Sequence, residues 1–188
     1  MVVPRSLAAS SCVLVCVLGA LVGCDETRPP KHVVHDPASV DVADQECLES
    51  AVVASCETAC DGGVMRSCTE LGRIYELGLN VTRDGIAAAA LYRRACDGGD
   101  MAGCYSAAYV LENGIAGRRD PHCAVAMYKY ACDGGYAQGC LMAGFMYKSG
   151  VEIEKDDAGA AEAFRKACAA GNEAGCKQLE TVGAPKPP

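Results

Sequence analysis

The sequence is organised by one stretch of ten residues that recurs four times at a constant spacing. Each copy begins with Ala-Cys and ends with a second cysteine eight residues after the first, at positions 59–68, 95–104, 131–140 and 167–176. Successive copies are 36 residues apart, with no slippage. A constant period of this length indicates stacked copies of one supersecondary unit. Because these cysteines repeat with the scaffold, we expect them to be structural.

Two helices are predicted in each 36-residue unit. The first helix is expected over roughly 64–77, 100–112 and 136–149, and each copy ends at a glycine, which adopts the left-handed cap conformation without a Cβ penalty. The second helix begins after an aspartate in each unit, and its carboxylate is suited to accept hydrogen bonds from the first-turn N–H groups. The second helix ends at the first cysteine of the next ten-residue copy. The predicted fold is therefore all-α, a solenoid of stacked helix pairs.

Each cysteine pair spans the turn between the second helix of one unit and the first helix of the next. Such a turn brings the helix ends close together, which suits the short Cα separation that a disulfide requires. Closing so small a loop stabilises a chain by roughly 2–3 kcal/mol per bridge in the chain-entropy model. The predicted disulfides are Cys60–Cys68, Cys96–Cys104, Cys132–Cys140 and Cys168–Cys176.

Other repeated positions carry a family resemblance. The stretches 71–78 (LGRIYELG) and 91–96 (LYRRAC) resemble the Sel1-like repeat, which is a TPR-like helix pair. The 36-residue period with a disulfide between cysteines eight apart resembles the Helicobacter cysteine-rich protein family within that group. The resemblance covers about residues 44–180 and implies an α/α solenoid. Two departures, Ala107-Ala108 in place of Leu-Gly and the linker CAAGN in place of CDGG, affect local cap geometry.

The first 23 residues have the pattern of a secretory signal. Arg5 is their only charge, and an apolar run follows over residues 7–22. The run ends in Leu-Val-Gly-Cys24, which resembles a bacterial lipobox and implies diacylation of Cys24 and cleavage before it. The alternative is an ordinary signal peptide with a cysteine near its cleavage site. We expect an exported, periplasmic protein that is anchored to a membrane through the Cys24 lipid.

The predicted domain organisation follows from this pattern. A flexible tether is expected first, then an incomplete first unit with one helix, three complete units, a polar capping helix and a Pro-rich disordered tail. The corresponding ranges are 1–23 for the signal, 24–43 for the tether, 44–60 for the partial unit, 61–96, 97–132 and 133–168 for the complete units, 169–180 for the capping helix and 181–188 for the tail.

Composition restricts the classes of partner. The chain has 17 basic and 24 acidic residues, and removal of the signal takes away only Arg5, which leaves a net charge near −8. Such a surface argues against nucleic acid as a partner. Fourteen cysteines in a chain that begins with an export signal indicate an oxidising compartment. We expect no metal site and no cofactor, because only His122 lies in the repeats and the pair His32 and His35 has no third ligand nearby.

Besides Cys24 and the two cysteines of the signal, three cysteines lie outside the repeated pairs. Cys47 and Cys56 can pair only if the chain between them is not a straight helix, since nine helical residues would hold them roughly 13–14 Å apart. Cys123 falls in the first turn of a predicted helix, where the other units have small residues. It is either a small residue filling an alanine site or a reactive or intermolecular thiol.

Two functions remain open at this point. Stacked helix pairs curve, and the first helix of each pair is expected to line the concave side, where aromatic side chains flanked by charges suit a peptide or protein partner. The alternative is a penicillin-binding protein with weak β-lactamase activity, as the resemblance implies, although the sequence has no Ser-x-x-Lys or Lys-Thr-Gly motif. We therefore expect no catalytic residues. The candidate groove residues are Arg66, Arg73, Glu76, Tyr105, Tyr109, Glu112, Leu141 and Phe145.

Overall fold

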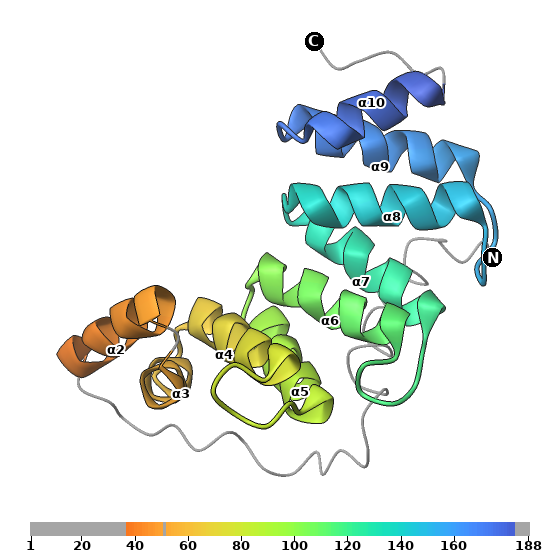
Figure 1. Cartoon of the computed structure of the whole chain (residues 1–188). Coiled ribbons are helices and arrows are strands. Elements are labelled where there is room, and N and C mark those ends of the chain that lie inside the picture. Colours follow the sequence, from red (N-terminus) through yellow and green to blue (C-terminus); the bar gives the residue numbers. More distant parts are fainter. Residues whose placement is uncertain (1–36, 51, 183–188) are drawn as a thin grey trace, which may run out of the picture. The chain divides into compact units, whose positions relative to one another are not determined.

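The computed structural model describes residues 37–50 and 52–182, and every regular element within these ranges is an α-helix (Figure 1). The chain divides after Asp120 into two compact units. We call residues 37–120 the N-terminal unit and residues 121–182 the C-terminal unit, and we describe each by itself. The predicted signal, the lipidation residue Cys24 and most of the predicted tether lie outside the described residues.

Consecutive helices pack on one another within each unit. We call the first helix of each repeat an A helix and the second a B helix. The N-terminal unit holds α2 (Pro37–Ser50), α3 (Val53–Asp61), α4 (Met65–Leu77), α5 (Gly85–Asp97) and α6 (Met101–Asn113). The C-terminal unit holds α7 (Pro121–Asp133), α8 (Ala137–Ser149), α9 (Asp157–Ala169) and α10 (Glu173–Thr181). The A helices are α4, α6, α8 and α10. The bounds of α4, α6 and α8 lie within one residue of the predicted ones, whereas α10 begins four residues after the start of the predicted capping segment 169–180.

Local cap chemistry sets these bounds. Gly78, Gly114 and Gly150 end three A helices with left-handed φ values of 72°, 68° and 62°. The predicted N-cap Asp84 accepts hydrogen bonds from the N–H groups of the next helix, α5, and Asp156 does the same for α9. The carboxylates thereby satisfy first-turn donors that have no partner inside the helix. These caps fix where the A helices end and where α5 and α9 begin.

The start of the repeat domain differs from the prediction. We expected a single helix within residues 44–60, preceded by a tether, but the structure has two helices there, and α2 begins at Pro37. The chain leaves α2 at Ser50 and enters α3 at Val53, so the segment is not a straight helix. Cys47 and Cys56 therefore come together, with Cα atoms 4.6 Å apart, in a disulfide. The first unit is thus a complete helix pair.

Four further disulfides join each B helix to the A helix that follows it. They link Cys60 to Cys68, Cys96 to Cys104, Cys132 to Cys140 and Cys168 to Cys176, with Cα separations between 4.4 and 4.7 Å. Cys123 is also disulfide-bonded. The paired cysteines at the helix turns therefore form part of the scaffold.

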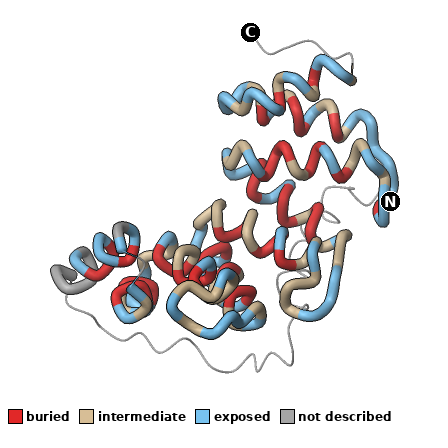
Figure 2. Tube along the Cα trace, viewed as in Figure 1, coloured by how far each residue is buried: buried red, intermediate tan, exposed pale blue. Residues whose placement is uncertain are grey.

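The core is built from small residues, sulfur and a few large side chains. Figure 2 shows buried residues along the sides of the helices that face their neighbours. Three aromatic side chains in equivalent positions of the B helices, Tyr92, Tyr128 and Phe164, are exposed by no more than 2%. In the C-terminal unit, Phe164 shares a core cluster with Leu141 and Leu179.

Glycine allows the helices to cross closely beside each disulfide. A Cβ atom on Gly139 would lie 2.9 Å from the Cβ atom of Ala131, and one on Gly175 would lie 2.5 Å from that of Ala167. Real Cβ contacts are longer than this, so a larger residue at either glycine would push the two helices apart. The Gly-Cys dipeptide near the start of these A helices therefore combines a close approach with a covalent link.

Candidate functional site

The A helices lie beside one another within each unit. In the N-terminal unit, α4 contacts both α2 and α6, and in the C-terminal unit α8 contacts α10. The outward sides of these helices correspond to the binding face that the sequence predicts. Its N-terminal section consists of α4 and α6, and its C-terminal section consists of α8 and α10.

Arg66 lies at the edge of the face and connects α4 to α2. Its guanidinium donates two hydrogen bonds to the carboxylate of Asp44, one of them from Nε at 3.1 Å, and the Ser67 hydroxyl donates to the same carboxylate at 2.6 Å. Asp44 is only 5% exposed. The hydrogen bond from Arg66 is the main reason that the pKa of Asp44 lies below its usual value, although burial opposes the shift. Arg66 thus holds α2 in place.

The predicted residues Arg73 and Glu76 take part in a polar cluster on α4. The guanidinium of Arg73 pairs with Glu70 on the same helix, one turn away. Glu76 accepts a hydrogen bond of 2.6 Å from the hydroxyl of Tyr92, a buried residue of α5. Burial, followed by the hydrogen bond to Glu76, raises the pKa of Tyr92. Glu76 therefore satisfies a core hydroxyl, while the Arg73 side chain remains 46% exposed.

On α6, the aromatic side chain that projects from the face is Tyr109. It is 39% exposed, whereas Tyr105 and Glu112 are partly buried. The start of α6 is tied to α4 because the Thr69 hydroxyl donates a 2.5 Å hydrogen bond to Asp100, the N-cap of α6. Tyr109 is therefore presented from a helix that its neighbour holds at the N-terminal end.

Leu141 is not on the face, contrary to the prediction. It is 9% exposed and packs in the core cluster that contains Phe164 and Leu179. The reason is that α10 lies against α8, so this position points into the seam between the two A helices. The equivalent residues Thr69 and Tyr105 are also partly buried. A helical wheel drawn for one helix does not include this neighbour.

Phe145 is the exposed aromatic residue of α8. It is 37% exposed, and its ring meets the ring of Phe164 edge to face, with centroids 5.5 Å apart and planes at 73°. Gly144 makes this possible, because a Cβ atom there would lie 2.5 Å from Cε1 of Phe164. The ring of Phe145 is therefore supported from below by a buried aromatic side chain.

Polar contacts that the repeat pattern did not indicate hold α10 against α8. Lys148 donates from Nζ to Oε1 of Gln178 and to Oγ1 of Thr181, each at 3.0 Å. The Asn172 amide, at the N-cap of α10, donates to Oε1 of Gln138 at 2.7 Å. Both links join residues about one period apart, so a search for complementary polar pairs at separations of 30–34 residues would have found them.

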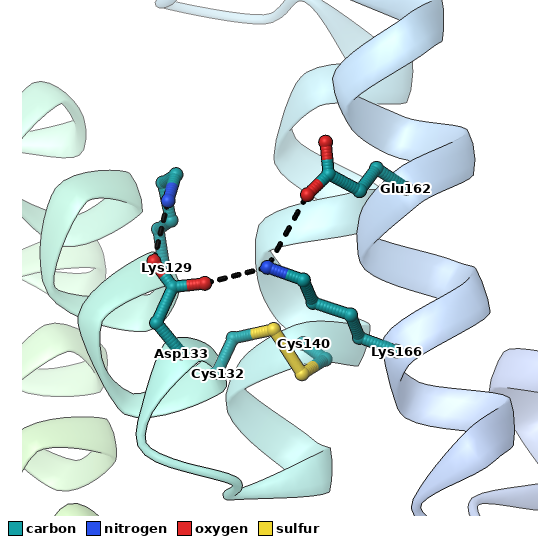
Figure 3. A network of polar contacts seen from close by, with 6 residues as sticks. All are labelled: Lys129, Cys132, Asp133, Cys140, Glu162 and Lys166. Carbon is teal, nitrogen blue, oxygen red and sulfur yellow. Dashed lines mark hydrogen bonds and ion pairs between the residues drawn. A yellow bond between two sulfur atoms is a disulfide. The ribbon is translucent and has the colours of Figure 1, made fainter.

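The B helices of the C-terminal unit carry a charge network beside the Cys132–Cys140 disulfide (Figure 3). Asp133 accepts from Lys129 at 2.5 Å and from Lys166 at 2.7 Å, and Lys166 also pairs with Glu162. Burial raises the pKa of Asp133, but the two ammonium groups more than offset it and the net shift is downward.

The same link occurs in the N-terminal unit, where Arg94 pairs with Asp61 at 2.7 Å. These side chains are roughly half exposed, so each pair adds little stability. The network joins adjacent B helices and has the character of a scaffold contact.

Within residues 37–50 and 52–182 there is no cluster of three His, Cys, Asp or Glu side chains suited to a metal ion. No described helix combines the length and apolar character that crossing a bilayer requires.

The fold and its repeated contacts define the class of protein. Helix pairs of constant length stack through disulfides, glycine–alanine crossings and ion pairs that recur at the same positions, which is the architecture of an α/α repeat protein.

The comparisons give the family. The family model of the Sel1 repeat matches residues 66–100, 102–136 and 137–172, more than half of the sequence. The chain therefore belongs to the Sel1 repeat family. The narrower resemblance to the Helicobacter cysteine-rich proteins stays a prediction. No curated protein matches the sequence.

Two solved structures share the fold. A Sel1 repeat protein from Oxalobacter formigenes superposes with a TM-score of 0.68 at 21% identity, over 77% of this chain and 62% of that one. A protective antigen present in uropathogenic Escherichia coli strains, described as displaying an SLR fold, has a TM-score of 0.68 at 18% identity, over 77% of this chain and 33% of that one. The chain thus spans less than two thirds of either protein, and at these identities the likeness shows the fold alone.

Proposed function

We propose that this chain is an exported scaffold that binds a protein partner, through an exposed peptide segment of that partner, on the outward face of its A helices. The observation that carries this proposal is the pair Tyr109 and Phe145. They stand 36 residues apart, at the same place in successive repeats, and are 39% and 37% exposed. Aromatic side chains held by a rigid scaffold are frequent binding hot spots, and α/α repeat proteins use their stacked helices as extended binding surfaces.

The charged surroundings support a peptide ligand over an apolar small molecule. Arg73 is 46% exposed on the α4 section of the face, and Lys148 is partly buried one turn after Phe145. An aromatic anchor with charged groups at its rim matches the usual anatomy of a protein–protein interface. The section on each unit offers these groups separately, so the proposal does not depend on how the two units are placed.

The test is a peptide selection on the oxidised chain, followed by affinity measurements on variants. We expect Tyr109→Ser to weaken peptides that bind the section on the N-terminal unit, and Phe145→Ser to weaken those that bind the section on the C-terminal unit. Each loss should be about 30-fold, which corresponds to a hot spot of about 2 kcal/mol. The matched control is Ile86→Ser, because Ile86 is an apolar side chain on the B helix α5 and is 64% exposed. Selected peptides that bind both serine variants as tightly as the parent chain would overturn the proposal.

Export and lipid attachment belong to the same proposal. Five disulfides support an oxidising compartment, because structural disulfides are rare where thiols are kept reduced. The lipobox-like sequence before Cys24 supports acylation at that residue. A labelled fatty acid should be incorporated into the parent chain and not into Cys24→Ser. Equal labelling of the two proteins would rule out Cys24 as the acylated residue.

A further inference from the structure

The ring of Phe145 forms an exposed aromatic surface, which we call the platform. One side of this ring already packs against the core of the C-terminal unit. Its ring rests edge to face on Phe164, which is 0% exposed and packs closely against Gly144. The ring is therefore held from below, and its remaining surface, 37% of the residue, faces outward. A fixed aromatic surface loses little conformational entropy when a ligand covers it, which favours binding there.

The chain leaves its last described helix beside this platform. Thr181, the final residue of α10, is 36 residues after Phe145 and so has the equivalent position on the next A helix. Packed helix axes are about 8–10 Å apart. Lys148, one turn after Phe145 on α8, donates to the Thr181 hydroxyl at 3.0 Å and fixes the end of α10 against α8. Val182 packs against the same core as Phe164.

The residues that follow have the composition of an aromatic-binding segment. Residues 183–188 read Gly-Ala-Pro-Lys-Pro-Pro and lie outside the described part of the chain. Their three prolines favour polyproline II, in which six residues extend about 19 Å. This reach exceeds the spacing between α10 and α8. Proline-rich segments in this conformation bind aromatic surfaces at a low entropy cost.

We propose that segment 183–188 folds back in the same chain and packs its prolines on the platform of Phe145. The inference rests on the proposed function to the extent that the covered surface is part of the proposed binding face. A segment tethered this close has a local concentration in the millimolar range and competes with any partner that needs Phe145. The segment then acts as a built-in competitor that weakens binding until a stronger ligand displaces it.

The test uses the fact that the chain has only two phenylalanines. Selective ring labelling with carbon-13 gives separate NMR signals for Phe145 and Phe164 without any substitution in the folded part. In the oxidised full chain, we expect nuclear Overhauser contacts between proline δ-protons and the Phe145 ring. In a chain that ends at Val182, these contacts should be lost, and the Phe145 signal should move more than that of Phe164.

Two variants within the segment sharpen the test. Pro185→Ser combined with Pro187→Ser should reproduce the truncation, whereas the matched control Lys186→Ser should keep the contacts because it leaves all prolines in place. Identical Phe145 signals in the full and truncated chains would overturn the proposal. Contacts that appear between a labelled copy and the segment of an unlabelled copy would overturn it as well, because the occupant would then be a second molecule.

This outcome is independent of the peptide selection on Tyr109 and Phe145. If segment 183–188 does not cover Phe145, a selected peptide can still bind there, and the proposed function stands. If no peptide depends on Phe145 but the segment contacts it, the segment is part of the fold and the proposed binding face is lost.

Discussion

Removal of one inter-helix disulfide should cost the N-terminal unit roughly 4–5 kcal/mol, from the loss of the cross-link and of two buried sulfur atoms. In the double variant Cys96→Ala, Cys104→Ala, the lost cross-link closes a short loop, since the two cysteines are 8 positions apart. The chain-entropy relation assigns about 2.6 kcal/mol to such a loop. Both cysteines are buried, at 3% and 0% exposure, so the removal of two sulfur atoms adds about 1 kcal/mol each if it resembles the loss of one buried methyl group.

The assay is urea unfolding of the oxidised chain, followed by circular dichroism. With a typical urea dependence for a small domain, the midpoint should fall by roughly 2–3 M. A second double variant, Cys96→Val with Cys104→Ala, refills one buried volume and serves as the packing control. It should recover no more than about 1 kcal/mol, since the cross-link is still absent. Full recovery in this variant, or a shift below about 0.5 M in the first, would refute the assignment of the stability to the covalent link.

Three other perturbations separate buried contacts from exposed ones. Asp44→Asn should destabilise α2 docking by about 2 kcal/mol in hydrogen exchange, since it removes the charge from a buried carboxylate that accepts hydrogen bonds from Arg66 and Ser67. Because the folded pKa of Asp44 is lowered from 3.8, the carboxylate stabilises the fold above that pH and loses this effect as pH falls, so the difference from the parent should shrink below pH 3.8. Gly144→Ala should cost about 1–2 kcal/mol in urea unfolding, as overpacking against Phe164 exceeds the helix-propensity gain, and Phe164→Leu should relieve it. Lys166→Met should cost less than about 1 kcal/mol, because its ion pairs are exposed, and a larger loss in the same assay would contradict that interpretation.

Regular spacing made most of the repeat architecture predictable. Glycine at the end of each A helix and aspartate before each B helix act through local backbone chemistry, which a sequence displays directly. The disulfides were predictable for the same reason, because cysteines at a fixed separation across a short turn meet in every repeat. The position of Tyr109 on an exposed face also follows from helical periodicity.

The parts that were not predictable depend on neighbours in space. Helix α2 has no equivalent at a shift of 36 residues, so the repeat pattern did not indicate that a helix begins at Pro37. Pairing of Cys47 with Cys56 depends on the break between α2 and α3. The burial of Leu141 depends on α10. The position of α10 against α8 is held by hydrogen bonds from Lys148, whose partners lie 30 or more residues later in the sequence. In each case, tertiary packing decides the outcome.

The order of the cysteines has a consequence for how the chain acquires its cross-links. Each of these five bridges joins cysteines that are eight or nine residues apart, and no other cysteine lies between the two partners. Starting from Cys47, an oxidase that joins each cysteine to the next one along the chain therefore produces the first three of these bridges, up to Cys96–Cys104. Cys123 follows Cys104 and precedes Cys132, so it is the residue of the repeats at which joining in this order would depart from the observed pairing. Apart from that residue, each repeat can acquire its bridge without disulfide reshuffling, as soon as its own two cysteines are present.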